Sequence, residues 1–232
     1  MKKSTKFLLW IVAVIAIVVL SYRWIYPSYT WHQKLTVEVE TPEGVKSGSA
    51  IVGINVKFGP SGLGDISGLT QGWHGEATIV DLDNGRYLFA LLGHPIYMAQ
   101  GTFVKKVSND PNYKITDVKE FYPKMQRIEG PVTVPRHRYF PLLVTFTDIN
   151  DPASVVRIDP YDLESHFGAG VKLKAVTLEI TTEPVTQDGV EQVLGWLDDP
   201  KVMKNPGWSK LPLESRRAIG ALKSYFPSIK GE

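Results

Sequence analysis

The feature that most constrains this chain is an apolar run near its N-terminus. Residues 7–20 read FLLWIVAVIAIVVL, without a charged side chain, and three lysines precede them. Continued to Tyr26, the run makes a helix of about 30 Å, which matches the hydrocarbon thickness of a bilayer. The sequence therefore predicts a short tail over residues 1–6 and a transmembrane anchor over residues 7–26.

The flanks of the run predict its orientation. The lysines lie before it, and Tyr22, Trp24 and Tyr26 lie at its far end, where an aromatic belt is expected. We therefore expect a single-pass protein of the inner (cytoplasmic) membrane, with its tail in the cytoplasm and its C-terminal domain in the periplasm. The alternative is a cleaved signal peptide, but the best cleavage site, Val19-Leu20-Ser21, lacks the usual Ala-x-Ala. An uncleaved signal-anchor is the favoured interpretation.

Charge and cysteine content exclude several classes of function. Four of the 26 basic residues precede Pro27, so the rest of the chain carries 22 against 24 acidic residues. Such a domain lacks the basic face that nucleic acid requires, and no nucleic-acid partner is expected. The chain has no cysteine, which excludes disulfides, thiolate metal sites and cysteine nucleophiles.

Hydrophobic alternation predicts a β-rich domain. Residues 34–41 alternate with period two, placing Leu35, Val37 and Val39 on one face, and residues 49–58 predict a second strand beyond a turn. Asp83-Asn84-Gly85 predicts a hairpin, because Asn-Gly favours a type I′ turn. Further strands are expected over the following ranges: 76–82, 86–92, 130–134, 142–147, 154–158 and 171–182. The apolar phase of the last strand shifts between Ala175 and Val176, which suggests a bulge or a strand that changes its covered face.

Other segments predict loops and helices. The six glycines between residues 59 and 75 indicate a long loop. Asp159 before Pro160 is typical of a helix N-cap, and helices are expected over residues 190–197 and 212–226. Residues 96–118 match neither period.

These elements predict an α+β fold. It would comprise an antiparallel β-sandwich or barrel-like domain over residues 27–185 and a helical C-terminal appendage over residues 186–232, behind one anchor.

Three segments carry a resemblance. LTVEVETPEGVKSGSA (35–50), VRIDPYDLESHFGAGVKLKAVTLEITTEPVT (156–186) and LGWL (194–197) resemble parts of an uncharacterised family of single-pass, membrane-anchored proteobacterial envelope proteins. The family has no assigned activity or binding site, so the resemblance implies an envelope location and transfers no catalytic residue.

The histidines form no recognisable catalytic or zinc motif. They are His32, His74, His94, His137 and His166, and no two have the i, i+4 spacing of a zinc helix. His74-Gly75-Glu76 matches the His-x-Glu of zinc deaminases but lacks the required cysteines. We expect surface or capping histidines, with a site assembled from distant ones as the minor alternative.

Two further clusters suggest ligands only weakly. Asp148, Asp151, Asp159 and Asp162 could supply calcium with oxygens, but they lack EF-hand spacing and fit local turns. Residues 119–140 interleave basic and aromatic side chains that could contact anionic headgroups, although a solvated loop with aromatics in the core is the more ordinary interpretation. The sequence predicts no metal and no cofactor.

Two functions remain as expectations. The first is a non-enzymatic, membrane-anchored envelope module that assists or joins a membrane-bound protein assembly, with the lipid bilayer and another envelope or membrane protein as partners. The alternative is an extracytoplasmic hydrolase-like enzyme whose site combines dispersed His and Asp residues near the glycine-rich loop. The sequence assigns no catalytic residue, and it leaves open whether the protein is an enzyme.

Overall fold

The computed structural model describes residues 3–60, 68–110, 115, 118–135, 139–203 and 207–225. The chain divides into two compact units. The first, the helical unit, holds residues 1–30 and 55–72, and the second, the sheet unit, holds residues 31–54 and 73–232.

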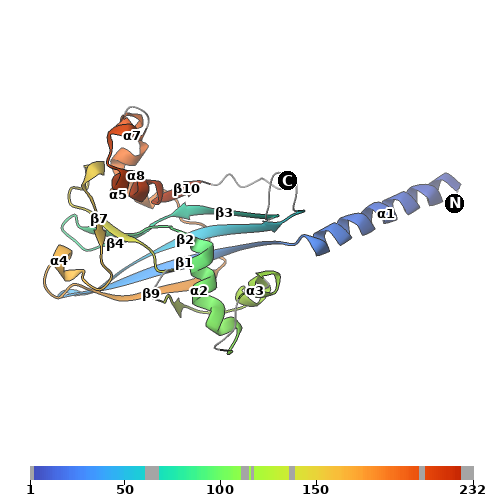
Figure 1. Cartoon of the computed structure of the whole chain (residues 1–232), viewed down its shortest axis with the longest axis horizontal. Coiled ribbons are helices and arrows are strands. Elements are labelled where there is room, and N and C mark those ends of the chain that lie inside the picture. The colour runs from blue at the N-terminus through green and yellow to red at the C-terminus, as the bar shows by residue number, and fades with distance from the viewer. Residues whose placement is uncertain are drawn as a thin grey trace. The chain divides into compact units, whose positions relative to one another are not determined.

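The helical unit is dominated by α1 (Lys3–Ile25), coloured blue at the N-terminus in Figure 1. Its segment Phe7–Ile25 is long and apolar enough to cross a membrane, and its side chains are unburied. The helical part of the prediction over residues 7–26 is thereby confirmed. After α1, Phe58 N–H donates to the Pro27 carbonyl at 3.1 Å, and the rings of Tyr29 and Phe58 meet edge to face. This pairing joins the first residues of one strand to the end of the next.

A six-stranded sheet forms most of the fold, and its predicted alternation is confirmed. Its strands follow the order β10-β3-β2-β1-β9-β6. Their bounds are β1 Ser28–Thr41, β2 Gly44–Phe58, β3 Leu69–Glu76, β6 Val132–Thr133, β9 Lys172–Thr181 and β10 Lys223–Tyr225. On β1, Leu35, Val37 and Val39 are buried, whereas the residues between them are half-buried or exposed. We call the face that carries these buried residues the inner face of the sheet, and the opposite face the outer face.

The predicted bulge on β9 is present, one position earlier than expected. β9 pairs antiparallel with β1, and Glu38 lies opposite Ala175 while Val39 lies opposite Leu173. Lys174 is therefore the extra residue, and it places both Leu173 and Val176 among buried residues. The bulge explains why the apolar phase of this strand changes in the sequence.

The second sheet has four strands in the order β4-β5-β7-β8. They are β4 Thr78–Asp81, β5 Tyr87–Ala90, β7 Leu143–Phe146 and β8 Val155–Ile158. The predicted hairpin joins β4 to β5: Arg86 N–H donates to the Asp83 carbonyl at 3.1 Å. Asn84 and Gly85, the central residues of this turn, have φ of 52° and 71°, as a type I′ turn requires.

Three assignments between residues 59 and 125 were wrong or missing. Residues 69–75 of the predicted loop belong to strand β3, and residues 61–67 lie outside the described part of the chain. The helices α2 (Pro95–Val107) and α3 (Val118–Met125) were not predicted. Gly101 within α2 and Pro123 within α3 are poor helix formers, so tertiary packing rather than propensity determines both helices.

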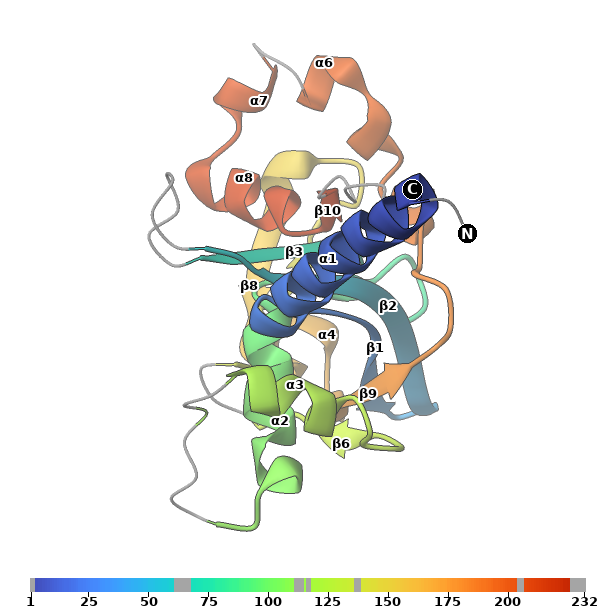
Figure 2. The ribbon, with the colours of Figure 1, turned by 90° about the vertical axis from the view of Figure 1, so that its right-hand side faces the viewer.

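These two helices pack on the inner face of the six-stranded sheet, whose strands bend around α2 in Figure 2. The Gln33 amide nitrogen donates to the carbonyl of Pro95 at 3.1 Å. The rings of Trp31 and Tyr122 lie 5.3 Å apart. Phe103, Phe121 and Tyr122 are fully buried, so the core of the sheet unit includes the inner side of α2 and α3.

The C-terminal part is helical, as predicted, but its last described segment is a strand. The short helices are α5 Gly189–Val193, α6 Pro200–Met203, α7 Gly207–Lys210 and α8 Leu213–Gly220, with a 3-10 turn at Gly195–Asp198. The helix predicted over residues 212–226 ends at Gly220, because β10 then pairs with β3, Lys223 lying opposite Glu76. Residue 226 lies outside the described residues.

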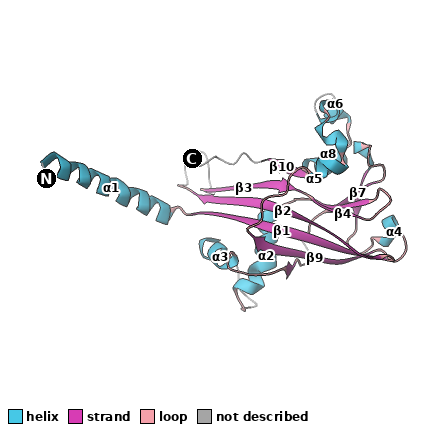
Figure 3. Ribbon diagram, turned by 180° about the vertical axis from the view of Figure 1, so that it is seen from behind, coloured by secondary structure: helices cyan, strands magenta, loops and turns pink. Residues whose placement is uncertain are grey.

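The C-terminal helices share a hydrophobic cluster with the four-stranded sheet. Val190, Leu194 and Ile219 pack with Phe89 and Phe146, and Figure 3 shows α5, α6 and α8 grouped beside β4 and β7. The boundary at residues 185 and 186 stays a prediction. The α+β fold with two antiparallel sheets is confirmed.

The predicted cap at Asp159 is wrong. The helix in this region is α4 (Glu164–Phe167), which begins later than expected. Asp159 instead accepts a hydrogen bond from Tyr161 N–H at 2.9 Å, forming a local Asx turn. Asp162 serves the helix, since its carboxylate accepts from Ser165 N–H at 3.2 Å.

Candidate functional site

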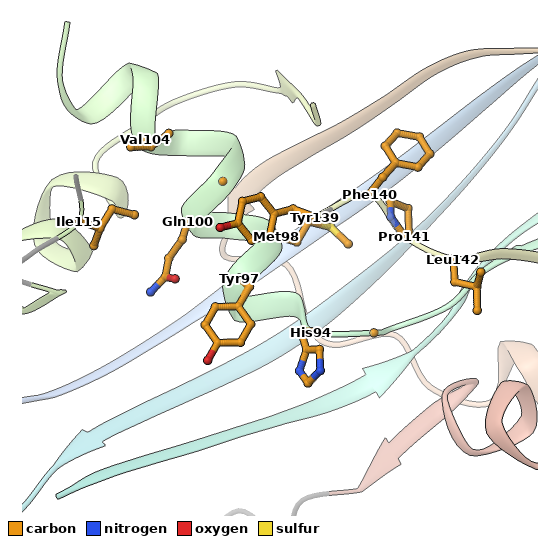
Figure 4. Close-up of a pocket in the computed structure, with 12 residues that line it drawn as sticks. His94, Tyr97, Met98, Gln100, Val104, Ile115, Tyr139, Phe140, Pro141 and Leu142 are labelled. Carbon is orange, nitrogen blue, oxygen red and sulfur yellow. The ribbon is translucent and has the colours of Figure 1, made fainter. Parts of the chain in front are cut away.

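A groove runs along α2 in the described sheet unit. Its volume is about 800 Å³, within the range of small-molecule sites. One wall is α2 and the other is the segment 139–142 (Figure 4). The lining residues are Gly93, His94, Tyr97, Met98, Gln100, Gly101, Val104, Ile115, Tyr139, Phe140, Pro141 and Leu142. We call this feature the α2 groove.

The groove is aromatic and aliphatic, with a few polar groups. In Figure 4, Gln100, Tyr97 and His94 project from one side of α2, and Ile115 and Leu142 lie beyond opposite ends of this row. Among the described lining residues there is no Asp, Glu, Lys or Arg. Such a site favours an uncharged ligand surface, because a buried charge would find no partner.

His94 lies at the N-cap position of α2, before Pro95, and makes no side-chain capping bond. Its ring contacts two others, with centroids 6.1 Å from Trp73 and 5.6 Å from Tyr97. The imidazole is thus held in an aromatic row at one end of the groove. The backbone explains its position: Pro is favoured at the first helical residue, which places residue 94 at the helix entry.

Gly101 allows the second wall to approach α2 closely. A Cβ on Gly101 would lie 2.2 Å from Cδ2 of Tyr139, so the Tyr139 ring rests on the helix backbone. Nearby, the Gln100 amide nitrogen donates to the Tyr122 hydroxyl at 3.0 Å, and burial raises the pKa of Tyr122. Gln100, which lines the groove, is therefore hydrogen-bonded to a residue of the core.

A second cluster, the His32–His74 pair, lies on the outer face of the sheet. The His74 imidazole covers Gly53, where a Cβ would lie 2.3 Å from its Cε1. The His32 Nδ1–H donates to the Glu183 carbonyl at 2.6 Å. Burial lowers the pKa of His74, and the neighbouring His32 lowers it further.

Within the described ranges, the structure places no histidine in a hydrogen bond with a carboxylate, the pairing that the hydrolase alternative would use. Of the histidines in the described ranges, His32, His74, His94 and His166, none hydrogen-bonds to a carboxylate. His166 lies on α4, and His137 lies outside the described residues. No group of three His, Asp or Glu side chains in the described ranges could hold a metal ion.

The acidic cluster instead serves local turns. Asp148 accepts from Asn150 N–H at 2.9 Å, and Asp151 accepts from Ala153 N–H at 2.8 Å. Hydrogen bonds from the Ser165 hydroxyl and N–H hold the pKa of Asp162 below its usual range. Each carboxylate thus stabilises its own backbone segment.

The basic and aromatic region at residues 119–140 divides in two. Phe121 and Tyr122 are buried in the core, whereas Tyr139 and Phe140 line the α2 groove. Arg136 and Arg138 lie outside the described residues. The sequence pattern therefore contained groove residues, but nothing in it distinguished them from core aromatics.

Glu76 has a structural role that sequence reasoning missed. Only 2% of the residue is exposed, and its two carboxylate oxygens accept from Gly189 N–H at 3.2 Å and Val190 N–H at 3.1 Å. Glu76, the acidic residue of the His-x-Glu match, thus links the start of α5 to β3 through these hydrogen bonds. It faces backbone donors, not a ligand.

Comparison with known proteins adds no relative: no family model, no curated protein and no solved structure matches this chain. The geometry of the site therefore carries the functional argument by itself.

Proposed function

We propose that this protein is a non-enzymatic binding module anchored in the inner membrane, with its sheet unit in the periplasm, where it joins a membrane-bound protein assembly. One observation carries the proposal: the lining of the α2 groove suits binding. It is apolar and aromatic, and no carboxylate lies among its described lining residues to work with His94. Catalysis of hydrolysis normally needs a base oriented by such a partner.

The anchor supports the same proposal. α1 exposes nearly all its apolar side chains, which in water would be costly and in a bilayer is favourable. The lysines before it favour a cytoplasmic N-terminus. The resemblance to anchored envelope proteins agrees with this location.

Orientation can be tested directly because the chain has no cysteine. Single cysteines at Ser4 and at the exposed Glu43 should respond oppositely to a membrane-impermeant maleimide. We expect Glu43→Cys to react once the outer membrane is opened, and Ser4→Cys only after the inner membrane is permeabilised. Labelling of Ser4→Cys first would contradict the orientation, and a soluble periplasmic chain beginning near Ser21 would contradict the anchor.

Assembly can be tested with the full-length protein. Crosslinking in intact cells, followed by purification in mild detergent, should recover a defined complex at constant stoichiometry. A chain that migrates only as a monomer before and after crosslinking would contradict the proposed membership in an assembly.

A further inference from the structure

The α2 groove has a shape and a chemistry that identify a class of ligand. Its lining side chains extend from Ile115 to Leu142 in Figure 4, and its walls include Met98, Val104 and Phe140. A long, flexible, uncharged chain of methylene groups fits such a lining, because apolar burial stabilises it and the described lining residues include no Asp, Glu, Lys or Arg that would need a partner.

The rim of the groove is unusually apolar for a water-exposed surface. Outside α1, the large hydrophobic residues that remain exposed in the described ranges are Val45, Tyr97, Leu142, Tyr161 and Leu213. Two of these five, Tyr97 and Leu142, belong to the groove. Clustering of exposed apolar groups at a concave site marks a binding surface, whereas scattered ones do not.

The covalent link to α1 limits how far the start of the sheet unit can lie from the membrane. α1 ends at Ile25, and the sheet unit begins at Trp31. Six peptide steps extend over about 20 Å at most. If α1 spans the bilayer as proposed above, the sheet unit therefore stays close to the membrane surface, where acyl chains are the most abundant apolar ligands.

From these observations we propose that the α2 groove binds one acyl chain of a bilayer phospholipid, with the headgroup outside the groove. The inference rests on the proposed anchoring and names the ligand class of the same binding site. Tyr97, Gln100 and His94 supply hydrogen-bonding groups along one side for the ester region. The apolar wall takes the methylene chain.

The test uses full-length protein in phosphatidylcholine nanodiscs that contain a phosphatidylcholine with a diazirine near the end of one acyl chain. After irradiation, mass spectrometry maps the labelled peptides. Label on Phe7–Ile25 serves as an internal positive control for every variant, since this segment is the expected membrane span. We expect additional label on peptides containing residues 94–104 and 139–142.

Leu142→Asp should reduce the groove label by roughly ten-fold, because the new carboxylate would be desolvated by an entering chain. Leu213→Asp is the matched control: Leu213 is 53% exposed, against 39% for Leu142, and does not line the groove. Tyr97→Asp provides a second groove variant if Leu142→Asp melts at a lower temperature than the control.

Two results would overturn the inference: label confined to α1, or groove label that the two groove variants leave unchanged. Either would point to a different occupant, such as a protein segment. Apart from the scaffold protein that encircles the lipid, the nanodiscs contain no candidate partner protein, so this failure leaves the assembly proposal intact. Failure of the anchor would instead appear as loss of label on α1 itself.

Discussion

The two faces of the six-stranded sheet differ in burial and in charge. On β1, the inner residues Leu35, Val37 and Val39 are buried beneath a core that includes α2. The outer residues alternate with them and carry charges, among them Glu38, which pairs with Lys174 at 3.2 Å. The difference teaches that stability comes from the inner face, whereas the outer face tolerates change except where the His74 ring covers Gly53.

The largest effect should come from the inner side of α2. Phe103 is fully buried, and Phe103→Ala should lower the free energy of unfolding by about 3–5 kcal/mol, through lost burial and the cavity left behind. Its neighbour Val104 faces the groove, so Val104→Ala should cost about 1 kcal/mol or less. Urea unfolding followed by circular dichroism measures both, and equal losses would contradict the assigned orientation of α2.

Gly53→Ala should give the largest effect on the outer face. Its methyl group would overlap the His74 ring, and overpacking typically costs about 1–3 kcal/mol. The double variant Gly53→Ala, His74→Ala should recover most of that loss, because the obstructing ring is gone. A double variant no more stable than Gly53→Ala would show that strain elsewhere in β2 causes the loss.

Acidification should act through His74 with a defined sign. Burial, reinforced by His32, lowers the pKa of His74 in the folded protein, so the unfolded chain, with a pKa of about 6.5, takes up this proton first. The stabilisation is fully present above that pH and is lost as the pH falls toward the folded pKa. Melting temperatures from pH 8 to pH 5 should fall less steeply for His74→Gln, and superimposable profiles would contradict this sign.

The smallest effect should come from the outer ion pair. Glu38 and Lys174 have side chains that are 37% and 47% exposed, so solvent screens their attraction. Glu38→Gln should change the free energy of unfolding by about 0.5 kcal/mol or less. A loss comparable with that of Phe103→Ala would mean that the outer face contributes far more than its exposure suggests.

The sequence predicted features that depend on local patterns. The alternation of β1, the turn at Asn84-Gly85 and the phase change on β9 each arise from a few neighbouring residues, and the structure contains all three. The helix α2 could not be predicted in the same way. It contains Gly101, Thr102 and Val104, which are weak helix formers, and it exists because the sheet buries one of its sides.

The groove escaped prediction for a related reason. Its walls come from α2 and from residues 139–142, which are close only after folding. Tyr139 approaches α2 because Gly101 has no side chain, and one glycine in a sequence does not indicate which ring will cover it. In the sequence alone, aromatic residues that line a groove cannot be distinguished from aromatic residues of a core.

The pairing of β1 with β9 and of β3 with β10 has a consequence for the time course of biosynthesis. His32 lies opposite Thr181, and Glu76 lies opposite Lys223, so each pair is separated by roughly 150 residues, and such non-local contacts form slowly. At about 5–20 residues per second, the ribosome needs about 8–30 s to make that stretch. Through this interval the β1–β2 hairpin has one partner strand still missing, and its open edge is available to another nascent chain.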